Sequence, residues 1–313
     1  MEIPHIPVLL KQVLGSFNTS RVLQDGILID CTLGFGGHTE ALLKTYSNLK
    51  IIGIDQDENA LMFAKKRLET FKDRISFRKG RYSSVAHELL EDEGLRLNIV
   101  GVLADIGVSS VQFDDKNRGF CFDSPMLDMR MDTNQQLSAK EIINGYSLSE
   151  LETIFKDFGE IREYKKLAHL IVDERKKVKF TNSKDLSTLI ARHFKHPKIH
   201  PATQAFQALR IAVNDELGEL ERLLQVLSKN PLTKEARISV ITFHSLEDRI
   251  VKQAFKEWER DCICNNDVMR CVCGGKCSKG RNLYKKPLCA DECELRENPR
   301  SRSAKLRSFE FRG

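Results

Sequence analysis

The stretch Gly26-Ile-Leu-Ile-Asp30-Cys-Thr-Leu-Gly34-Phe-Gly36-Gly37-His38 decides the fold. Residues 27–29 are apolar and mostly β-branched, which is typical of a buried parallel strand, and the turn after Asp30 leads into the apolar spacing of a helix. This order of strand, glycine-rich turn and helix brings the backbone close to a nucleotide-like ligand. The glycines do not spell G-x-G-x-x-G, so an ordinary tight turn between a strand and a helix stays open.

Three further apolar runs extend the pattern. Lys50–Asp55, Ile75–Arg78 and Ile99–Asp105 are predicted strands, each followed by a helical segment. Repeated strand–helix units predict an α/β fold with a doubly wound, mostly parallel sheet. The acids that end strands are Asp30, Asp55 and Asp105. Ligands bind at the carboxyl ends of such strands, where an acid such as Asp55 accepts hydrogen bonds from ribose hydroxyls, so we expect the site there.

The middle of the chain changes character. We expect residues 1–123 to form the first part of the sheet domain, residues 124–215 an inserted helical, substrate-binding domain, and residues 216–313 the second part. Apolar residues at steps of three or four predict one strong helix from Pro201 to about Leu227. A fifth strand at 237–243 precedes a helix, for which Ser245 and Asp248 predict a capping box, and a last strand lies at 305–312.

The positive charge of the chain is concentrated near its end. Residues 262–313 carry a net charge of +6, which equals the net charge of all 313 residues. Such a local excess suits a polyanion such as nucleic acid, and a solvated basic tail is the alternative. No apolar run approaches the ~20 residues that span a bilayer, and the start of the chain does not have the pattern of a signal peptide. We therefore expect a cytoplasmic protein.

Seven of the nine cysteines lie in the segment 262–293. Thiols of a cytosolic protein stay reduced, which argues against a disulfide framework. Clustered thiols in a segment with little apolar content favour a metal, with zinc as the first candidate. The predicted ligands are Cys262, Cys264, Cys271 and Cys273. The spacing is not that of a standard C-x₂-C knuckle, so a loop of metal-free thiols stays open.

Several motifs together resemble those of the bacterial family of S-adenosylmethionine-dependent methyltransferases that act on the N4 of a cytosine in 16S ribosomal RNA. The first half contains His5-Ile-Pro-Val-Leu-Leu, Asp30-Cys-Thr-Leu-Gly-Phe-Gly-Gly-His-Thr39, Gly53-Ile-Asp-Gln-Asp57, Asp105-Ile-Gly-Val-Ser-Ser-Val-Gln-Phe-Asp-Asp115, Arg118-Gly-Phe and Leu127-Asp-Met-Arg-Met-Asp132. The second half contains His200-Pro-Ala-Thr-Gln-Ala-Phe-Gln-Ala-Leu-Arg-Ile211, Phe243-His-Ser-Leu-Glu-Asp-Arg-Ile-Val-Lys252 and Glu297-Asn-Pro-Arg-Ser-Arg-Ser303. These motifs span nearly the whole chain.

The resemblance implies a Rossmann-like class I methyltransferase domain with an inserted helical domain, and S-adenosylmethionine as the cofactor. The cofactor contacts that it implies are Gly36, Gly37, His38, Asp55, Tyr82, Asp105 and Gln112. Asp105 is also the first candidate for contact with the amine of the substrate. The implied partner is 16S rRNA in the context of the small ribosomal subunit. A methyltransferase of DNA or protein, or a non-enzymatic protein that binds RNA or metal, are the alternatives.

Basic side chains supply candidate RNA contacts. The candidates are Arg118, Arg130, Arg210, Lys276, Lys279, Lys285 and Lys286. For each arginine an internal salt bridge is an equally good interpretation. The lysines are chosen because they lie in the segment that carries the excess charge.

Overall fold

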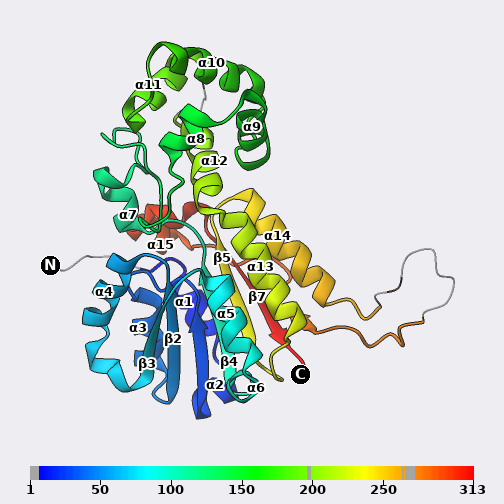
Figure 1. The fold of residues 1–313 in the computed structure, drawn as a ribbon. Coiled ribbons are helices and arrows are strands. Elements are labelled where there is room, and N and C mark those ends of the chain that lie inside the picture. Colours follow the sequence, from blue (N-terminus) through cyan, green and yellow to red (C-terminus); the bar gives the residue numbers. More distant parts are fainter. Residues whose placement is uncertain (1–6, 196–198, 263, 265–271) are drawn as a thin grey trace. The chain divides into compact units, whose positions relative to one another are not determined.

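The computed structural model of the chain describes residues 7–195, 199–262, 264 and 272–313 (Figure 1). The chain divides into two compact units. The sheet unit comprises Met1–Gly107 and Gly218–Gly313, and the helical unit comprises Val108–Leu217. The predicted insertion, 124–215, lies inside the helical unit, which begins earlier in the chain. The earlier start follows from packing, because Val108 and Phe120 belong to the same apolar cluster as Leu127.

One seven-stranded sheet organises the sheet unit. Its order is β3-β2-β1-β4-β5-β7-β6, and the first five strands in this order are parallel. The strands are β1 (Gly26–Asp30), β2 (Leu49–Asp55), β3 (Ile75–Lys79), β4 (Ile99–Asp105), β5 (Arg237–Thr242), β6 (Gly280–Asn282) and β7 (Lys305–Phe311). β7 runs antiparallel to both β5 and β6. The prediction of a doubly wound, mostly parallel sheet is confirmed.

Helices cover both faces of this sheet, because alternate strand residues are apolar on each side. Leu28 packs in one buried cluster and its neighbour Ile29 in the other. The first cluster includes side chains from α1 (Leu10–Ser16), α2 (Ser20–Gln24), α3 (Gly37–Thr45) and α4 (Glu58–Arg67). The second includes side chains from α5 (Tyr82–Glu91), α13 (Glu216–Lys229) and α14 (Ser245–Trp258). The sheet unit also contains the short helices α6 (Glu93–Arg96) and α15 (Glu292–Glu297).

The helical unit has a core of its own, formed by side chains such as Phe155, Leu167 and Leu209. Its helices are α7 (Ser110–Asp114), α8 (Ala139–Gly145), α9 (Leu148–Thr153), α10 (Tyr164–Lys177), α11 (Ser183–His193) and α12 (Thr203–Asn214). A π-helical turn, η3 (Ile154–Phe158), follows α9.

The single long helix predicted after Pro201 is wrong, because the structure breaks it into α12 and α13. Asp215 between them adopts a left-handed conformation with φ of 54°. The side chain of Asn214 accepts a hydrogen bond from the Met131 amide at 2.8 Å and donates one to the Met129 carbonyl at 2.8 Å. These contacts fix the end of α12 against the loop that contains Met129 and Met131. Asp215 can then reverse the chain, because Asp tolerates the left-handed region better than most residues.

The predicted capping box of α14 is also wrong, by one residue. The N-cap is His244, and the Glu247 carboxylate accepts hydrogen bonds from the amides of Phe243 at 2.7 Å and His244 at 3.2 Å. Asp248 instead accepts from Arg307 of β7 at 2.7 Å. The helix is capped at His244 because Glu247 is wholly buried at the start of α14 and accepts hydrogen bonds from two backbone amides.

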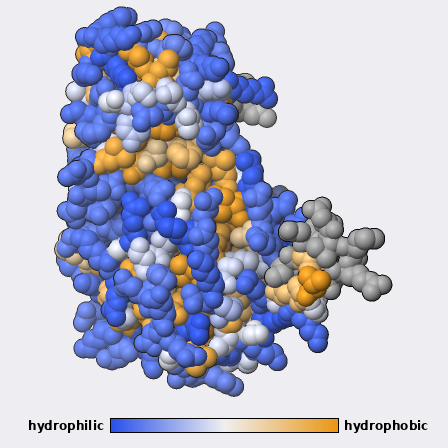
Figure 2. All heavy atoms as spheres, turned by 45° about the vertical axis from the view of Figure 1, so that its right-hand side comes forward, coloured by the Kyte–Doolittle hydropathy of each residue, from blue (hydrophilic) through white to orange (hydrophobic). Residues whose placement is uncertain are grey.

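Hydrophilic residues predominate on the face drawn in Figure 2. Large hydrophobic side chains of the described residues that are more than half exposed include Leu23, Met62, Val178 and Val272. They come from distant parts of the chain, and scattered exposed apolar residues are normal on a folded protein. No helix in the part of the chain that the structure describes has the length and apolar content needed to cross a membrane.

Candidate active site

The side chain of Asp30 stabilises the turn between β1 and α3. Its carboxylate accepts hydrogen bonds from the Thr39 hydroxyl at 2.7 Å and from the Thr32 amide at 3.2 Å. Burial raises the pKa of Asp30, and the hydrogen bond from Thr39 opposes that rise. Asp30 is only 1% exposed and both of its oxygens accept hydrogen bonds within the turn, so it positions the turn instead of facing a ligand.

Two glycines of this turn leave no room for side chains. Gly36 is the N-cap of α3 with φ of 78°, a conformation that other residues rarely adopt. A Cβ atom on Gly37 would lie 2.7 Å from the side chain of Pro7. Both positions therefore require glycine, Gly36 for its backbone conformation and Gly37 for its packing against Pro7, and their predicted contact with the cofactor stays a prediction.

Asp55, at the end of β2, is tied to the same turn. One carboxylate oxygen accepts a hydrogen bond from the Gly34 amide at 2.7 Å, and the other accepts from the Asp57 amide at 2.8 Å. Burial raises the pKa of Asp55 to about 6, helped by the charges of Asp57 and Asp30 and opposed by the two backbone hydrogen bonds. Each carboxylate oxygen has a second lone pair, so Asp55 can still accept hydrogen bonds from two ligand hydroxyls.

Asp105, at the end of β4, has a different environment. The hydroxyl of Thr32 accepts a hydrogen bond from the Asp105 backbone amide at 2.6 Å, and Nε2 of His38 lies 3.4 Å from Oδ2 of Asp105. Among the described residues, Oδ1 of Asp105 and both ring nitrogens of His38 are buried polar atoms without a hydrogen-bond partner. Buried polar atoms are nearly always satisfied, and Nε2 of His38 already faces the Asp105 carboxylate, so Oδ1 of Asp105 and Nδ1 of His38 are the two atoms that point to a ligand.

Tyr82 and Gln112 are the remaining predicted cofactor contacts. Tyr82 begins α5 and is half-buried against the core of that sheet face. Gln112 belongs to the helical unit, where its side chain accepts a hydrogen bond from the Ser109 amide at 3.1 Å and Ser109 caps the Gln112 amide in return. The predicted cofactor roles of Tyr82 and Gln112 stay predictions.

The structure therefore brings four short segments of the sheet unit to one edge of the sheet. They are the glycine-rich turn with His38, the end of β2, the start of α5 and the end of β4. Sequence reasoning missed Thr32, which supports both Asp30 and Asp105, and Thr39, which fixes Asp30. The only sequence signal for them was their position, because Thr32 lies in the turn after Asp30 and Thr39 lies in the first turn of the helix that follows.

The three arginines predicted to bind RNA all make contacts inside the helical unit. Arg118 donates to the carbonyls of Arg130 and Met131, both at 2.9 Å. Arg130 forms a two-pronged pair with Asp128 at 2.8 and 2.7 Å. Arg210 forms a similar pair with Glu216 at 2.8 and 2.9 Å. The contacts of Arg130 and Arg210 favour the salt-bridge interpretation, those of Arg118 are hydrogen bonds to backbone carbonyls, and RNA binding by these arginines stays a prediction.

The four lysines of the basic segment divide into two groups. Lys276, Lys285 and Lys286 are exposed, as a surface contact with a polyanion requires. Lys279 is half-buried, and its ammonium group donates a hydrogen bond to the Ser228 carbonyl at 2.8 Å. This structural contact distinguishes Lys279 from the three exposed lysines.

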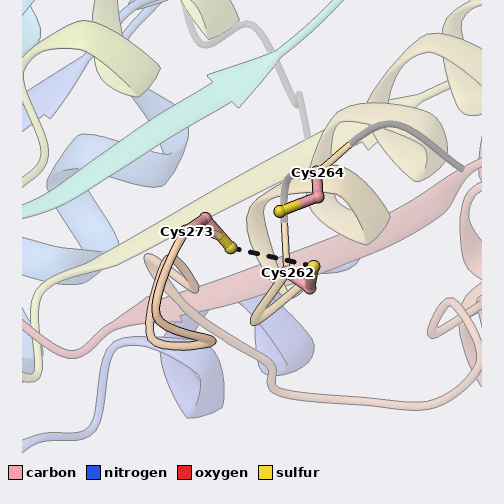
Figure 3. A group of neighbouring side chains, drawn as sticks. All are labelled: Cys262, Cys264 and Cys273. Carbon is pink, nitrogen blue, oxygen red and sulfur yellow. Dashed lines mark hydrogen bonds between the residues drawn. The ribbon is translucent and has the colours of Figure 1, made fainter. Parts of the chain in front are cut away.

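Three of the four predicted metal ligands lie together. The sulfur atoms of Cys262, Cys264 and Cys273 are all within 4.8 Å of one another (Figure 3). The fourth predicted ligand, Cys271, lies outside the described residues.

The sheet order, with β7 antiparallel to β5, and the acid-lined glycine-rich edge define a Rossmann-like methyltransferase fold. The chain belongs to the MraW methylase family, whose family model matches residues 2–312. It is 56% identical over 313 residues to a protein of Wolinella succinogenes named ribosomal RNA small subunit methyltransferase H, with all of both chains covered. Proteins of the same name from Aliarcobacter butzleri and Helicobacter pylori are 51% and 49% identical, with 99% and 98% of this chain and 100% and 97% of those proteins covered.

Proposed function

We propose that this protein transfers a methyl group from S-adenosylmethionine to the exocyclic N4 of a cytosine in 16S rRNA of the small ribosomal subunit. The observation that carries the proposal is full-length similarity at 56% identity to a protein named as a methyltransferase of small-subunit ribosomal RNA. The site at the carboxyl edge of the sheet supplies the chemistry that such a reaction needs.

The residues present fit S-adenosylmethionine. Asp55 can accept hydrogen bonds from ribose hydroxyls, and the unsatisfied atoms of His38 and Asp105 need polar partners. When bound, the cofactor supplies a methyl group on a positively charged sulfur. The negative charges of Asp55 and Asp105 at this edge favour a cationic ligand.

Asp105 is the proposed contact to the substrate amine. The lone pair of the cytosine amine is delocalised into the ring, so the amine is a poor nucleophile and must be aligned with the methyl group. Oδ1 of Asp105 can accept a hydrogen bond from an N–H of that amine, which orients the lone pair and stabilises the positive charge that develops on nitrogen. The Thr32 hydroxyl accepts a hydrogen bond from the Asp105 amide, which fixes the backbone from which this side chain extends.

The substrate class is tested with a panel of acceptors and a radiolabelled methyl donor. Small ribosomal subunits that lack the modification, naked 16S rRNA, duplex DNA and a protein extract are each incubated with the purified chain and labelled S-adenosylmethionine. We expect label in the rRNA of the small subunits, and a chain with Asp105→Ala as the matched control should leave it unlabelled. Label only in DNA or in protein would overturn the proposal and support a methyltransferase of another substrate.

A further inference from the structure

The segment that follows α14 brings three thiols together without an apolar core around them. Sγ of Cys273 donates to Sγ of Cys262 at 3.7 Å, and Cys264 completes a triangle with no side longer than 4.8 Å. Figure 3 shows the three side chains pointing toward one another. A tetrahedral Zn²⁺ ion with sulfur ligands at ~2.3 Å holds those sulfurs ~3.8 Å apart, whereas a disulfide needs about 2.05 Å.

We propose that Cys262, Cys264 and Cys273 bind a single Zn²⁺ ion that joins the two ends of this segment. The distance of 3.7 Å between the sulfurs of Cys262 and Cys273 matches the spacing around one ion. A cluster of several irons binds at most two of its cysteine thiolates on any one iron, so three sulfurs within 4.8 Å of one another suit a single ion better. Three thiolates suit zinc, and a tetrahedral site then has one position for a fourth ligand.

The backbone around the thiols favours their ionised form. The Val272 amide donates a hydrogen bond to Sγ of Cys264 at 3.3 Å, and such a donor stabilises a thiolate more than a thiol. Gly274 and Gly275 follow Cys273 with φ of 79° and 66°, so the chain turns back directly after the third ligand. Each coordinating thiol gives up its proton when the ion binds, which makes binding weaker at low pH.

The two ends of the segment are anchored to the sheet unit without help from the thiols. The Cys277 amide donates to the Asp261 carbonyl at 3.0 Å, and the Lys279 amide donates to the Trp258 carbonyl at 2.7 Å. These bonds hold the chain that enters β6 beside the end of α14, which places Cys273 opposite Cys262 and Cys264. Val272, which directly precedes Cys273, is 81% exposed, so burial of this apolar side chain does not stabilise the loop. A bound metal ion could supply that stability.

Metal content tests the proposal directly. The full chain is purified without chelator from zinc-supplemented cells, and metals are quantified by mass spectrometry for the native chain and for Cys262→Ser, Cys264→Ser and Cys273→Ser. Cys289→Ser and Cys293→Ser are the matched controls, because both thiols are exposed, follow β6 in the chain and lie outside the triangle. We expect about one equivalent of zinc in the native chain and the controls, and below about a tenth in the three variants.

A second measurement guards against misfolded variants. Amide hydrogen exchange of the native chain is compared before and after chelation, and we expect exchange to accelerate at least tenfold in peptides from 258–281 and to stay unchanged in β1 and α3. Cobalt substitution should give the intense near-ultraviolet absorption of metal–thiolate bonds. Less than about a tenth of an equivalent of any metal in the native chain after reconstitution under reducing conditions would overturn the proposal. So would full zinc content in Cys262→Ser, or a Cys262–Cys273 disulfide in the reduced, zinc-supplied protein.

Discussion

Two carboxylates at the same edge of the sheet have different surroundings and therefore different proposed tasks. Both oxygens of Asp55 accept backbone hydrogen bonds, which fixes the side chain and leaves lone pairs for hydroxyls. Oδ1 of Asp105 has no such partner among the described residues and is the better acceptor for a substrate amine. The sequence predicted both acids from their places at strand ends. It could not predict their partners, because the Thr32 contact to Asp105 joins residues 73 apart in the chain.

Cofactor affinity should depend on pH through Asp55. The pKa of Asp55 is raised to about 6, so the carboxylate is ionised above that value and protonates as the pH falls through it. Protonation removes acceptor capacity, so we expect affinity for S-adenosylmethionine to fall as the pH drops from about 8 to about 5. Calorimetry across this range measures the effect.

Asp55→Asn is the control for that experiment. The substitution removes the titrating group and one acceptor oxygen, which should lower affinity at pH 8 by roughly one to two orders of magnitude. Its remaining pH dependence should be flatter than that of the native chain. An equally steep profile in both proteins would show that another group controls the pH dependence.

Removal of the Asp105 carboxylate should separate transfer from binding. We expect Asp105→Asn to lower kcat by about a hundredfold or more, because the substitution removes the negative charge that stabilises the positive charge developing on the amine nitrogen, with a smaller effect on affinity for the cofactor. Single-turnover assays and calorimetry on the same preparations distinguish the two effects. A near-normal rate with intact binding would remove Asp105 from the reacting centre.

At the scale of elements, strands were predictable and helix breaks were not. The central strands β1 and β4 are continuous apolar runs, because both faces of the sheet are covered there, whereas the edge strand β3 is only half-buried to exposed. β6 is only three residues long, Gly280–Asn282, with no apolar pattern, so it was missed. The break at Asp215 depends on contacts between Asn214 and the loop at Met129–Met131, which a periodicity argument cannot include.

The loop between α7 and α8 should depend on Arg130 for its stability. Arg130 pairs with Asp128 and donates to the carbonyls of Thr133 and Gln135 at 3.0 and 2.7 Å. Burial acts to raise the pKa of Asp128, but the hydrogen bonds from Arg130 outweigh it and the pKa is lowered. We therefore expect Arg130→Ala to reduce the free energy of unfolding by about 1.5–3 kcal/mol.

Arg130→Lys and Arg162→Ala are the comparisons for this loop. The lysine keeps the charge without the planar fork, so it should recover only part of the stability. Arg162 is an exposed arginine of the same unit, and its removal should change stability by less than about 0.5 kcal/mol. Denaturant unfolding measures all three. Unchanged stability of Arg130→Ala together with weaker RNA binding would instead favour the phosphate-contact interpretation.

At the scale of the whole chain, charge is separated along the sequence. The last 52 residues, 262–313, carry the entire net charge of +6, and they include both the exposed lysines and the thiol triangle. The composition predicted this segment as a candidate RNA contact. It could not distinguish Lys279, whose ammonium group is directed to the Ser228 carbonyl, from the exposed lysines beside it.

Charge reversal of Lys276, Lys285 and Lys286 should weaken RNA binding and its salt dependence together. For every phosphate that a lysine no longer neutralises, the slope of log affinity against log salt should become shallower by about 0.7–0.9. Binding of 16S rRNA fragments at several salt concentrations measures both quantities. Lys279→Met is the matched comparison. It removes a charged group that donates a hydrogen bond to the Ser228 carbonyl, so it should alter stability more than the salt slope. Unchanged affinity and slope after the triple reversal would identify a solvated tail.

The identity of the methylated nucleoside distinguishes methylation at N4 of cytosine from every other methyl transfer to rRNA. Small subunits that lack the modification, with cytosines deuterated at C5, are treated with the chain and S-adenosylmethionine, and the digested rRNA is analysed by chromatography and mass spectrometry. We expect one methylcytidine that co-migrates with the N4-methyl standard and retains the C5 deuterium, and we expect none when Asp105→Ala replaces the native chain. Loss of the C5 deuterium, or a methyl group on any other base, would overturn the proposed function.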